Sequence, residues 1–266
     1  MKKILLFIAP ALFFFSCNNN NAGSTETVNA GPPLLPFNVV NVYPHDTASF
    51  TEGLLVHNGQ MYESTGGSPH DNEFTSWFGP IDLKTGKALQ KVPLDTAYFG
   101  EGITILNGKI YQLTWRGKIG FVYDEKTLKK IKDFTYTGEG WSLTNDGKSL
   151  IMSDGSSNLR YLDPETLQVQ KIVSVEDNNG PVANVNELEY IHGAIYANVW
   201  QTNYIIKIDP SNGHVTGKMD LTPLYNEAHS KFAYADVLNG IAFDSAANKI
   251  YVTGKTWPNL YEIRLN

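Results

Sequence analysis

The chain has 266 residues, of which 42% are hydrophobic and 12% aromatic, so it can bury a core and is not mainly disordered. Its 27 acidic residues outnumber its 21 basic ones, and the resulting net charge of -6 argues against a general nucleic-acid-binding protein. The single cysteine, Cys17, excludes an intramolecular disulfide and a zinc site made of several cysteines.

The first residues have the features of a lipoprotein signal peptide. Two lysines precede an apolar run that is too short to span a membrane, and a small residue, Ser16, stands directly before Cys17. We expect residues 1–16 to be removed and Cys17 to be lipidated; an ordinary signal peptide or an incidental cysteine is the alternative. Residues 17–36 are rich in Asn, Ser, Thr, Gly and Pro and are predicted to be a flexible tether. The protein is then expected in the bacterial cell envelope, held to the membrane only by the lipid and facing the periplasm or the outside.

Residues 37–266 are predicted to form one domain, because they contain five related units spaced 38 to 53 residues apart. Each unit has an apolar run, a turn such as Asn-Gly or Asp-Gly, and a second run that is apolar and aromatic, which predicts a β-hairpin. The units begin at Glu52-Gly53, Glu101-Gly102, Glu139-Gly140, Asn186-Glu187 and Asn239-Gly240.

Further along, four of the units carry a turn that begins with Asp and is followed by a fourth strand. These fourth strands are expected at 89–94, 129–136, 169–175 and 215–221. Four strands per unit at this spacing predict an all-β fold, a five-bladed β-propeller. The last unit ends in its third strand, so residues 37–43 are expected to complete it and close the ring. No long run with helical spacing is evident; a repetitive β-sandwich or a solenoid is the alternative.

Common catalytic motifs are missing from the sequence. The six histidines do not have the spacing of metal ligands, and there is no GxSxG motif. The segment Gly254-Lys255-Thr256 resembles the end of a phosphate-binding loop but lacks the glycine that should precede it. We therefore predict no metal ligands and no cofactor, although a structural cation in the channel stays open.

Repeat symmetry places seven polar or aromatic residues at one end of the propeller channel. Some lie at the start of the first strand of a unit and others at the end of the second strand. Each one alone is more often structural or solvent-exposed, but their common location predicts a small-molecule site. They are Glu52, Glu101, Trp141 and Asn186 in the first group and Trp115, Trp200 and Lys255 in the second.

Motifs around these residues resemble the glutamine cyclotransferase family, the plant and bacterial type of glutaminyl-peptide cyclotransferase. The resemblance covers roughly residues 37–266, with many motifs in the same order. They include Phe50-Thr51-Glu52-Gly53-Leu54, Phe99-Gly100-Glu101-Gly102, Leu113-Thr114-Trp115, Asn186-Glu187-Leu188-Glu189-Tyr190, Ala197-Asn198-Val199-Trp200 and Thr253-Gly254-Lys255.

The resemblance implies a monomeric five-bladed propeller that converts the N-terminal glutamine of peptides or proteins to pyroglutamate and releases ammonia. It implies that Glu101 transfers the proton and that Lys255 and Asn186 stabilise the oxyanion. The remaining residues of the site are expected to bind the substrate: Glu52, Phe50, Phe99, Trp115, Trp141 and Trp200.

Two features depart from the family pattern. Glu52 stands where the family often has Gln, and its carboxylate is expected either to bind the substrate amine or to raise the pKa of Glu101. Residues 67–81, which include Trp77 and Phe78, are expected to form a bulkier loop than usual at the entrance of the pocket, unless they are a neutral surface variation.

Two other functions stay open at the level of the sequence. One is a non-catalytic propeller of the cell envelope that binds a ligand or a partner at the same rim. The other is a different hydrolytic propeller, such as a calcium-dependent lactonase. A lactonase needs an acidic metal cage, and only Glu52 and Glu101 are candidates for one.

Overall fold

The computed structural model describes residues 31–67 and 76–266. The predicted signal peptide, Cys17 and the first part of the predicted tether lie outside the described residues, as do residues 68–75 of the predicted entrance loop.

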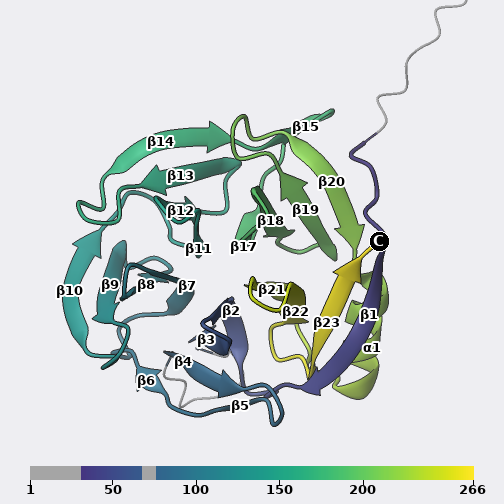
Figure 1. Ribbon diagram of the computed structural model, residues 1–266, viewed down its shortest axis with the longest axis horizontal. Coiled ribbons are helices and arrows are strands. Elements are labelled where there is room, and N and C mark those ends of the chain that lie inside the picture. Colours follow the sequence, from purple (N-terminus) through teal and green to yellow (C-terminus); the bar gives the residue numbers. More distant parts are fainter. Residues whose placement is uncertain (1–30, 68–75) are drawn as a thin grey trace, which may run out of the picture.

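Five antiparallel sheets are arranged around a central channel, each with its first strand innermost (Figure 1). The fold is therefore the predicted five-bladed β-propeller. Blade 1 contains β2 (Phe50–His57), β3 (Gln60–Gly66), β4 (Trp77–Asp82), β5 (Lys87–Ala88) and β6 (Val92–Pro93). Blade 2 contains β7 (Gly100–Leu106), β8 (Lys109–Thr114), β9 (Ile119–Asp124) and β10 (Lys130–Thr135). Blade 3 contains β11 (Ser142–Asn145), β12 (Leu150–Ser153), β13 (Asn158–Leu162) and β14 (Val169–Ser174).

Blades 4 and 5 complete the ring. Blade 4 contains β17 (Val185–Ile191), β18 (Ala194–Val199), β19 (Tyr204–Ile208) and β20 (Val215–Asp220). Blade 5 contains β21 (Leu238–Asp244), β22 (Lys249–Gly254), β23 (Asn259–Leu265) and, as its outer strand, β1 (Phe37–Pro44). A separate hairpin of β15 (Glu176–Asp177) and β16 (Gly180–Pro181) precedes blade 4.

The ring closes as the sequence predicts, because the first strand of the chain pairs with the last. β1 runs antiparallel to β23, with Phe37 opposite Leu265 and Pro44 opposite Asn259 (Figure 1). Closure by strands from the two ends of the chain gives blade 5 its fourth strand and leaves β23 paired on both sides, by β22 and by β1.

Turn residues explain the regular spacing of the strands. Asn58 and Asn107 adopt left-handed backbone conformations, which Asn tolerates, and each is followed by a glycine with positive φ. The predicted Asp turns also form: the side chain of Asp124 accepts a hydrogen bond from the backbone N–H of Thr127 at 2.8 Å, and Asp163 does the same for Thr166 at 2.7 Å.

Blade 1 differs from the prediction in its outer half. Of the fourth strand expected at 89–94, only the short β6 forms; β5 lies just before that range, and both short strands pair with β4. Trp77 and Phe78 do not belong to an entrance loop, because both are buried in β4. Their apolar side chains pack into the core instead.

One helix forms, although the sequence shows no long run with helical spacing. α1 (Thr222–Lys231) follows β20 and lies on the outside of blade 5 (Figure 1). It begins with a proline in its first turn and buries only Leu224 and Ala228 against the core, which is too few apolar positions to give a clear helical period. Within the described parts of the chain, no helix is long and apolar enough to cross a membrane.

The end of the predicted tether is not free. The backbone N–H of Leu35 donates to the carbonyl of Lys218 at 2.8 Å, and the N–H of Lys218 donates to the carbonyl of Pro33 at 2.9 Å. Residues 33–35 therefore lie along β20, next to the strand that closes the ring.

Candidate active site

A cavity of about 590 Å³ opens where the inner strands of the blades begin. All nine catalytic and substrate-binding residues predicted from the sequence line it, although they are spread over all five blades. They are Phe50, Glu52, Phe99, Glu101, Trp115, Trp141, Asn186, Trp200 and Lys255.

Irregularities in the inner strands direct the polar side chains toward this cavity. The pairing register shifts at Glu52 in β2, at Glu101 in β7 and at Asn186 in β17. A further shift occurs at Asn239 in β21. Such β-bulges leave an extra residue unpaired and turn its side chain away from the regular alternation of the strand. The same local distortion in four blades thus gathers polar groups at one end of the channel.

Glycines after the two glutamates allow the inner strands to approach closely. A Cβ atom on Gly53 would lie 2.8 Å from the backbone nitrogen of Ile103, and one on Gly102 would lie 2.5 Å from the Cα of Ser142. Only glycine fits between strands at these distances. In each Glu-Gly pair, the glutamate therefore provides a side chain to the site, and the glycine leaves room for the inner strand of the neighbouring blade.

Glu52 and Lys255 form a buried ion pair in the lining of the cavity. The Nζ atom of Lys255 lies 2.6 Å from Oε1 of Glu52, and the side chains are 8% and 2% exposed. The same ammonium lies 4.6 Å from the centre of the Phe50 ring. Asn239 supports the pair by donating a hydrogen bond of 3.4 Å to the second oxygen of Glu52. Glu52 is thus already bound to protein groups on both oxygens.

Glu101 is a buried carboxyl group beside this pair. Burial, the negative charge of Glu52 and the hydrogen bond that it shares with Glu52 raise the pKa of Glu101 well above its ordinary value, despite the positive charge of Lys255. Burial raises the pKa of Glu52 as well, and Lys255 and the hydrogen bond from Glu101 offset this only in part, so the pKa of Glu52 stays above its ordinary value but is raised less than that of Glu101. The arrangement therefore favours a proton on Glu101 and a negative charge on Glu52.

Aromatic rings form the walls of the cavity. Phe50 packs against Phe99 with the ring centres 6.2 Å apart, and Phe99 packs against Trp115 at 5.7 Å. On the other wall, Trp141 and Trp200 are in edge-to-face contact at 5.5 Å. These walls exclude water from Glu101 and offer a rigid apolar surface to a ligand.

Asn186 contributes a buried amide to the cavity. Its side chain is 3% exposed, and its Oδ1 atom has no hydrogen-bond partner among the described residues. A buried oxygen without a partner is unfavourable in the free protein, so it is suited to accept a hydrogen bond from a bound ligand.

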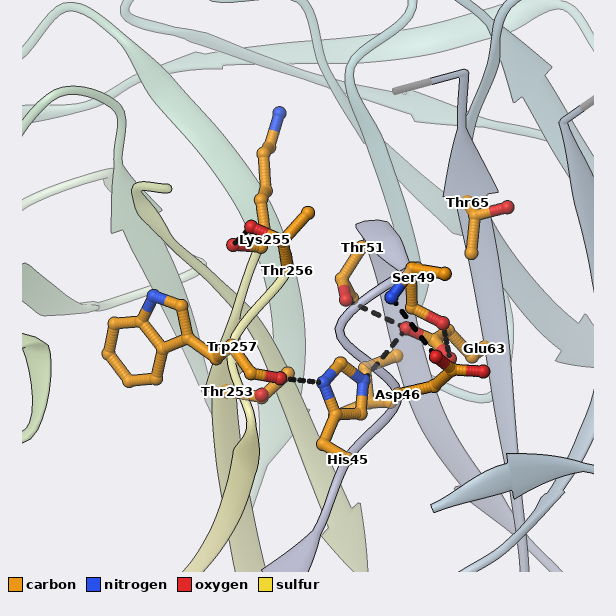
Figure 2. A network of polar contacts seen from close by, with 12 residues as sticks. His45, Asp46, Ser49, Thr51, Glu63, Thr65, Thr253, Lys255, Thr256 and Trp257 are labelled. Atoms are coloured by element: carbon orange, nitrogen blue, oxygen red, sulfur yellow. Dashed lines mark hydrogen bonds and ion pairs between the residues drawn. The ribbon is translucent and has the colours of Figure 1, made fainter. Parts of the chain in front are cut away.

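A buried polar network holds the segment that carries Lys255 (Figure 2). The His45 ring contacts the carbonyl of Trp257 through Nδ1 at 2.8 Å and the carboxylate of Glu63 through Nε2 at 3.1 Å. Ser49 and Thr51 donate further hydrogen bonds to Glu63. Since both ring nitrogens of His45 face acceptors, these contacts favour the doubly protonated imidazole, and the pKa of His45 is raised despite its burial.

Comparisons with known proteins agree with this geometry. A family model described as glutamine cyclotransferase matches residues 11–265. The chain belongs to the glutamine cyclotransferase family. It is 39% identical over 264 residues to a glutaminyl-peptide cyclotransferase of Arabidopsis thaliana, covering 98% of this chain and 81% of the plant protein. The crystal structure of a glutaminyl cyclase from Myxococcus xanthus superposes with a TM-score of 0.81 and 32% identity, over 88% of this chain and 98% of that one.

Some residues that line the cavity were not predicted from the sequence. Gln201, Asp236 and Val237 also line the cavity, as does Gly67, the first residue of the segment expected at the pocket entrance. Gln201 follows Trp200 directly, so the repeat could have indicated it. Asp236 and Val237 follow α1, where the repeat pattern is interrupted, and no signal marks them.

Glu187 is another residue that sequence reasoning left without a role. Its carboxylate accepts hydrogen bonds from the backbone N–H groups of Leu54 at 3.2 Å and Ile241 at 2.8 Å, which joins the inner strands of blades 1, 4 and 5. Burial raises its pKa well above the ordinary value. In the described ranges, no three His, Cys, Asp or Glu side chains are grouped so as to hold a metal ion.

Proposed function

We propose that this protein is a glutaminyl-peptide cyclotransferase, which converts the N-terminal glutamine of peptides or proteins to pyroglutamate. The observation that carries the proposal is the buried group of Glu101, Glu52 and Lys255 inside an aromatic cavity. Its similarity to the plant glutaminyl-peptide cyclotransferase over nearly the whole chain supports the same activity.

The reaction needs one proton to be moved rather than supplied. The α-amine of the substrate attacks the carbon of its own side-chain carboxamide and forms the ring C–N bond. The C–N bond to the carboxamide nitrogen breaks, and ammonia leaves. The amine loses one proton and the leaving nitrogen gains one, so a single carboxyl group can perform both transfers.

Glu101 is the group proposed for this transfer. It must be a carboxylate to take the proton from the amine and a carboxylic acid to give it to the leaving nitrogen. A raised pKa keeps the acid form of Glu101 accessible at a pH where an ordinary glutamate is fully ionised, and efficient acid–base catalysis requires both forms to be accessible.

Lys255 and Asn186 are proposed to act on the substrate carbonyl. The Lys255 ammonium has protons beyond the one directed at Glu52, and together with the Asn186 amide it can stabilise the negative charge that develops on the oxygen. The unpartnered Oδ1 of Asn186 can also accept a hydrogen bond from a substrate N–H. The two residues thus polarise the carbonyl and hold the reacting group in place.

The aromatic walls are proposed to fold the glutamine back on itself. An extended glutamine keeps its amine away from its carboxamide, so cyclisation requires a compact conformer. A rigid cavity between Trp115, Trp141 and Trp200 favours that conformer and removes the entropy cost from the chemical step.

The two alternative functions receive less support. A non-catalytic binding protein does not require a buried carboxyl group with a raised pKa beside an ammonium group. The family model is not that of a lactonase.

Incubating the full-length protein with a peptide that begins with Gln tests the proposal. We expect release of ammonia and a product lighter by one ammonia molecule, both unaffected by EDTA. A peptide that begins with Asn is the matched control, because its shorter side chain cannot form the same ring. If no Gln-initiated peptide is converted, the protein is instead a binding protein.

The location of the protein is a separate proposal. We infer that Cys17 is lipidated and that the propeller is anchored in the cell envelope, supported by the apolar run and Ser16 before it. Intact-mass measurement of the protein from cells is expected to show an acyl mass on Cys17 and processing that is sensitive to globomycin. Insensitive processing without an acyl mass would contradict the anchor.

A further inference from the structure

Glu139 lies beside the cavity and links its two aromatic walls. Its Oε2 atom accepts hydrogen bonds from the indole N–H of Trp115 at 2.7 Å and from that of Trp141 at 2.9 Å. One oxygen therefore fixes two indoles that come from different blades and different walls.

The other contacts of Glu139 reinforce this arrangement. The Nε atom of Arg116 lies 3.7 Å from Oε1 of Glu139, and the Arg116 guanidinium stacks on the Trp115 ring at 3.8 Å. The backbone N–H of Gly140 donates to the carbonyl of Trp115 at 3.2 Å, which keeps the two segments adjacent. These contacts hold the carboxylate at the N–H edges of both indoles.

A chain of contacts passes around the cavity through this one carboxylate. On one side Trp115 packs on Phe99, and on the other Trp141 packs on Trp200. Behind Trp141 there is little space, because a Cβ atom on Gly155 would lie 2.5 Å from the indole ring. Trp141 is therefore confined by Gly155 on one side and oriented by Glu139 through its N–H.

We propose that Glu139 is a positioning residue for the cyclisation, because it orients the indole rings of Trp115 and Trp141 that hold the folded glutamine. This inference rests on the proposed function of the cavity. The role needs an acceptor oxygen more than a negative charge, since what it supplies to each indole is a hydrogen bond. The charge of Glu139 has a smaller effect of its own, as one of several causes that raise the pKa of Glu101.

Two substitutions separate orientation from charge. Glu139→Ala removes the acceptor, and we expect kcat/KM to fall by about tenfold, mainly through a higher KM, because the binding surface loses its fixed geometry. Glu139→Gln has an amide oxygen that can accept hydrogen bonds from both indole N–H groups, so its kcat/KM is expected to lie close to that of the wild type. Glu165→Ala, which removes an exposed carboxylate paired with Lys109 on the outer surface, is the control and is expected to behave as the wild type.

A spectroscopic readout makes the test independent of turnover. The protein has five tryptophans, and their indole N–H resonances can be assigned with Trp115→Phe and Trp141→Phe. In Glu139→Ala, the resonances of these two indoles are expected to move upfield, because they lose a charged acceptor, and in Glu139→Gln they are expected to return part of the way. The side chain of Glu139 is 39% exposed, so neither substitution opens the core.

The outcomes are distinct. Unmoved indole resonances, an unchanged kcat/KM in Glu139→Ala, or equal losses in Glu139→Ala and Glu139→Gln would each overturn the positioning role. A wild-type protein that binds but does not cyclise Gln-initiated peptides would contradict the proposed function instead, and the resonance shifts would still decide whether Glu139 orients the two indoles.

Discussion

At the scale of single residues, the site depends on how one proton and one negative charge are divided between two carboxyl groups. Glu52 is paired with Lys255 at 2.6 Å, so it keeps its charge, and that charge helps to hold a proton on Glu101. Of the two roles expected for Glu52, the structure favours tuning the pKa of Glu101 over binding the substrate amine, because both of its oxygens already have partners. The positive charge of Lys255 thus neutralises the negative charge of Glu52 before the substrate binds.

The Glu52→Gln variant tests this division. Removing the carboxylate takes away the negative charge that raises the pKa of Glu101, and it leaves Lys255 free to lower that pKa further. The proton-accepting form of Glu101 then persists to lower pH, so the acidic limb of the kcat/KM profile is expected to move to lower pH. A limb that stays in place or moves to higher pH would contradict the role given to Glu52.

At the scale of elements, the β-bulges direct polar side chains of the repeated inner strands into the cavity, and the glycines beside them let these strands pack closely. The sequence predicts that Glu101 lies at the start of an inner strand, because the repeat aligns it with Glu52 and Asn186. It does not predict the bulges, since a register shift depends on the pairing between two strands and leaves no composition signal. The contacts of Glu139 are hidden for the same reason, because they join segments whose distance is set by the packing of two blades.

Gly102→Ala tests the importance of close approach between the inner strands. The added methyl group would lie 2.5 Å from the Cα of Ser142, which is backbone and cannot rotate away. We expect the free energy of unfolding to fall by about 1–3 kcal/mol, as for other overpacked positions, together with a loss of activity. Denaturant unfolding measures the first and ammonia release the second.

Gly59→Asn is the control for this substitution. Gly59 lies in a hairpin turn at a φ of +76°, and no described atom lies within 4 Å of the position of its Cβ. Asn tolerates this backbone conformation, so a change within about 0.5 kcal/mol is expected. If Gly102→Ala is no more destabilising than Gly59→Asn, close approach is not what requires glycine at position 102.

At the scale of the whole molecule, the site depends on closure of the ring. Lys255 belongs to blade 5, whereas its partner Glu52 belongs to blade 1, and the pairing of β1 with β23 closes the ring between these two blades. The network of His45 and Glu63 joins the same two blades (Figure 2). The sequence predicts the closing strand from the missing fourth strand of the last unit. It does not predict this network, because His45 belongs to no motif and its partner Trp257 lies at the other end of the chain.

His45→Gln tests the contribution of the network to closure. Burial alone lowers the pKa of His45, but the charge and hydrogen bond of Glu63 and the carbonyl of Trp257 outweigh it and raise the pKa above its ordinary value of 6.5. The stabilisation is therefore complete below that value and is lost as pH rises through the raised folded-state pKa.

We expect His45→Gln to lower the free energy of unfolding by about 2–4 kcal/mol at acidic to neutral pH, and by less at alkaline pH. Denaturant unfolding of both proteins at about pH 6 and about pH 9 measures the difference. A difference that is constant or that grows with pH would contradict a charged His45.

The most direct test of the central claim compares Glu101→Gln with the wild type on one Gln-initiated peptide, measuring both turnover and binding. Glu125→Gln, the same substitution at a carboxylate that pairs with His57 away from the cavity, is the control. We predict that Glu101→Gln loses activity by about 10²-fold or more while it still binds the peptide, because an amide cannot carry the proton. Turnover by Glu101→Gln equal to that of Glu125→Gln would contradict the account.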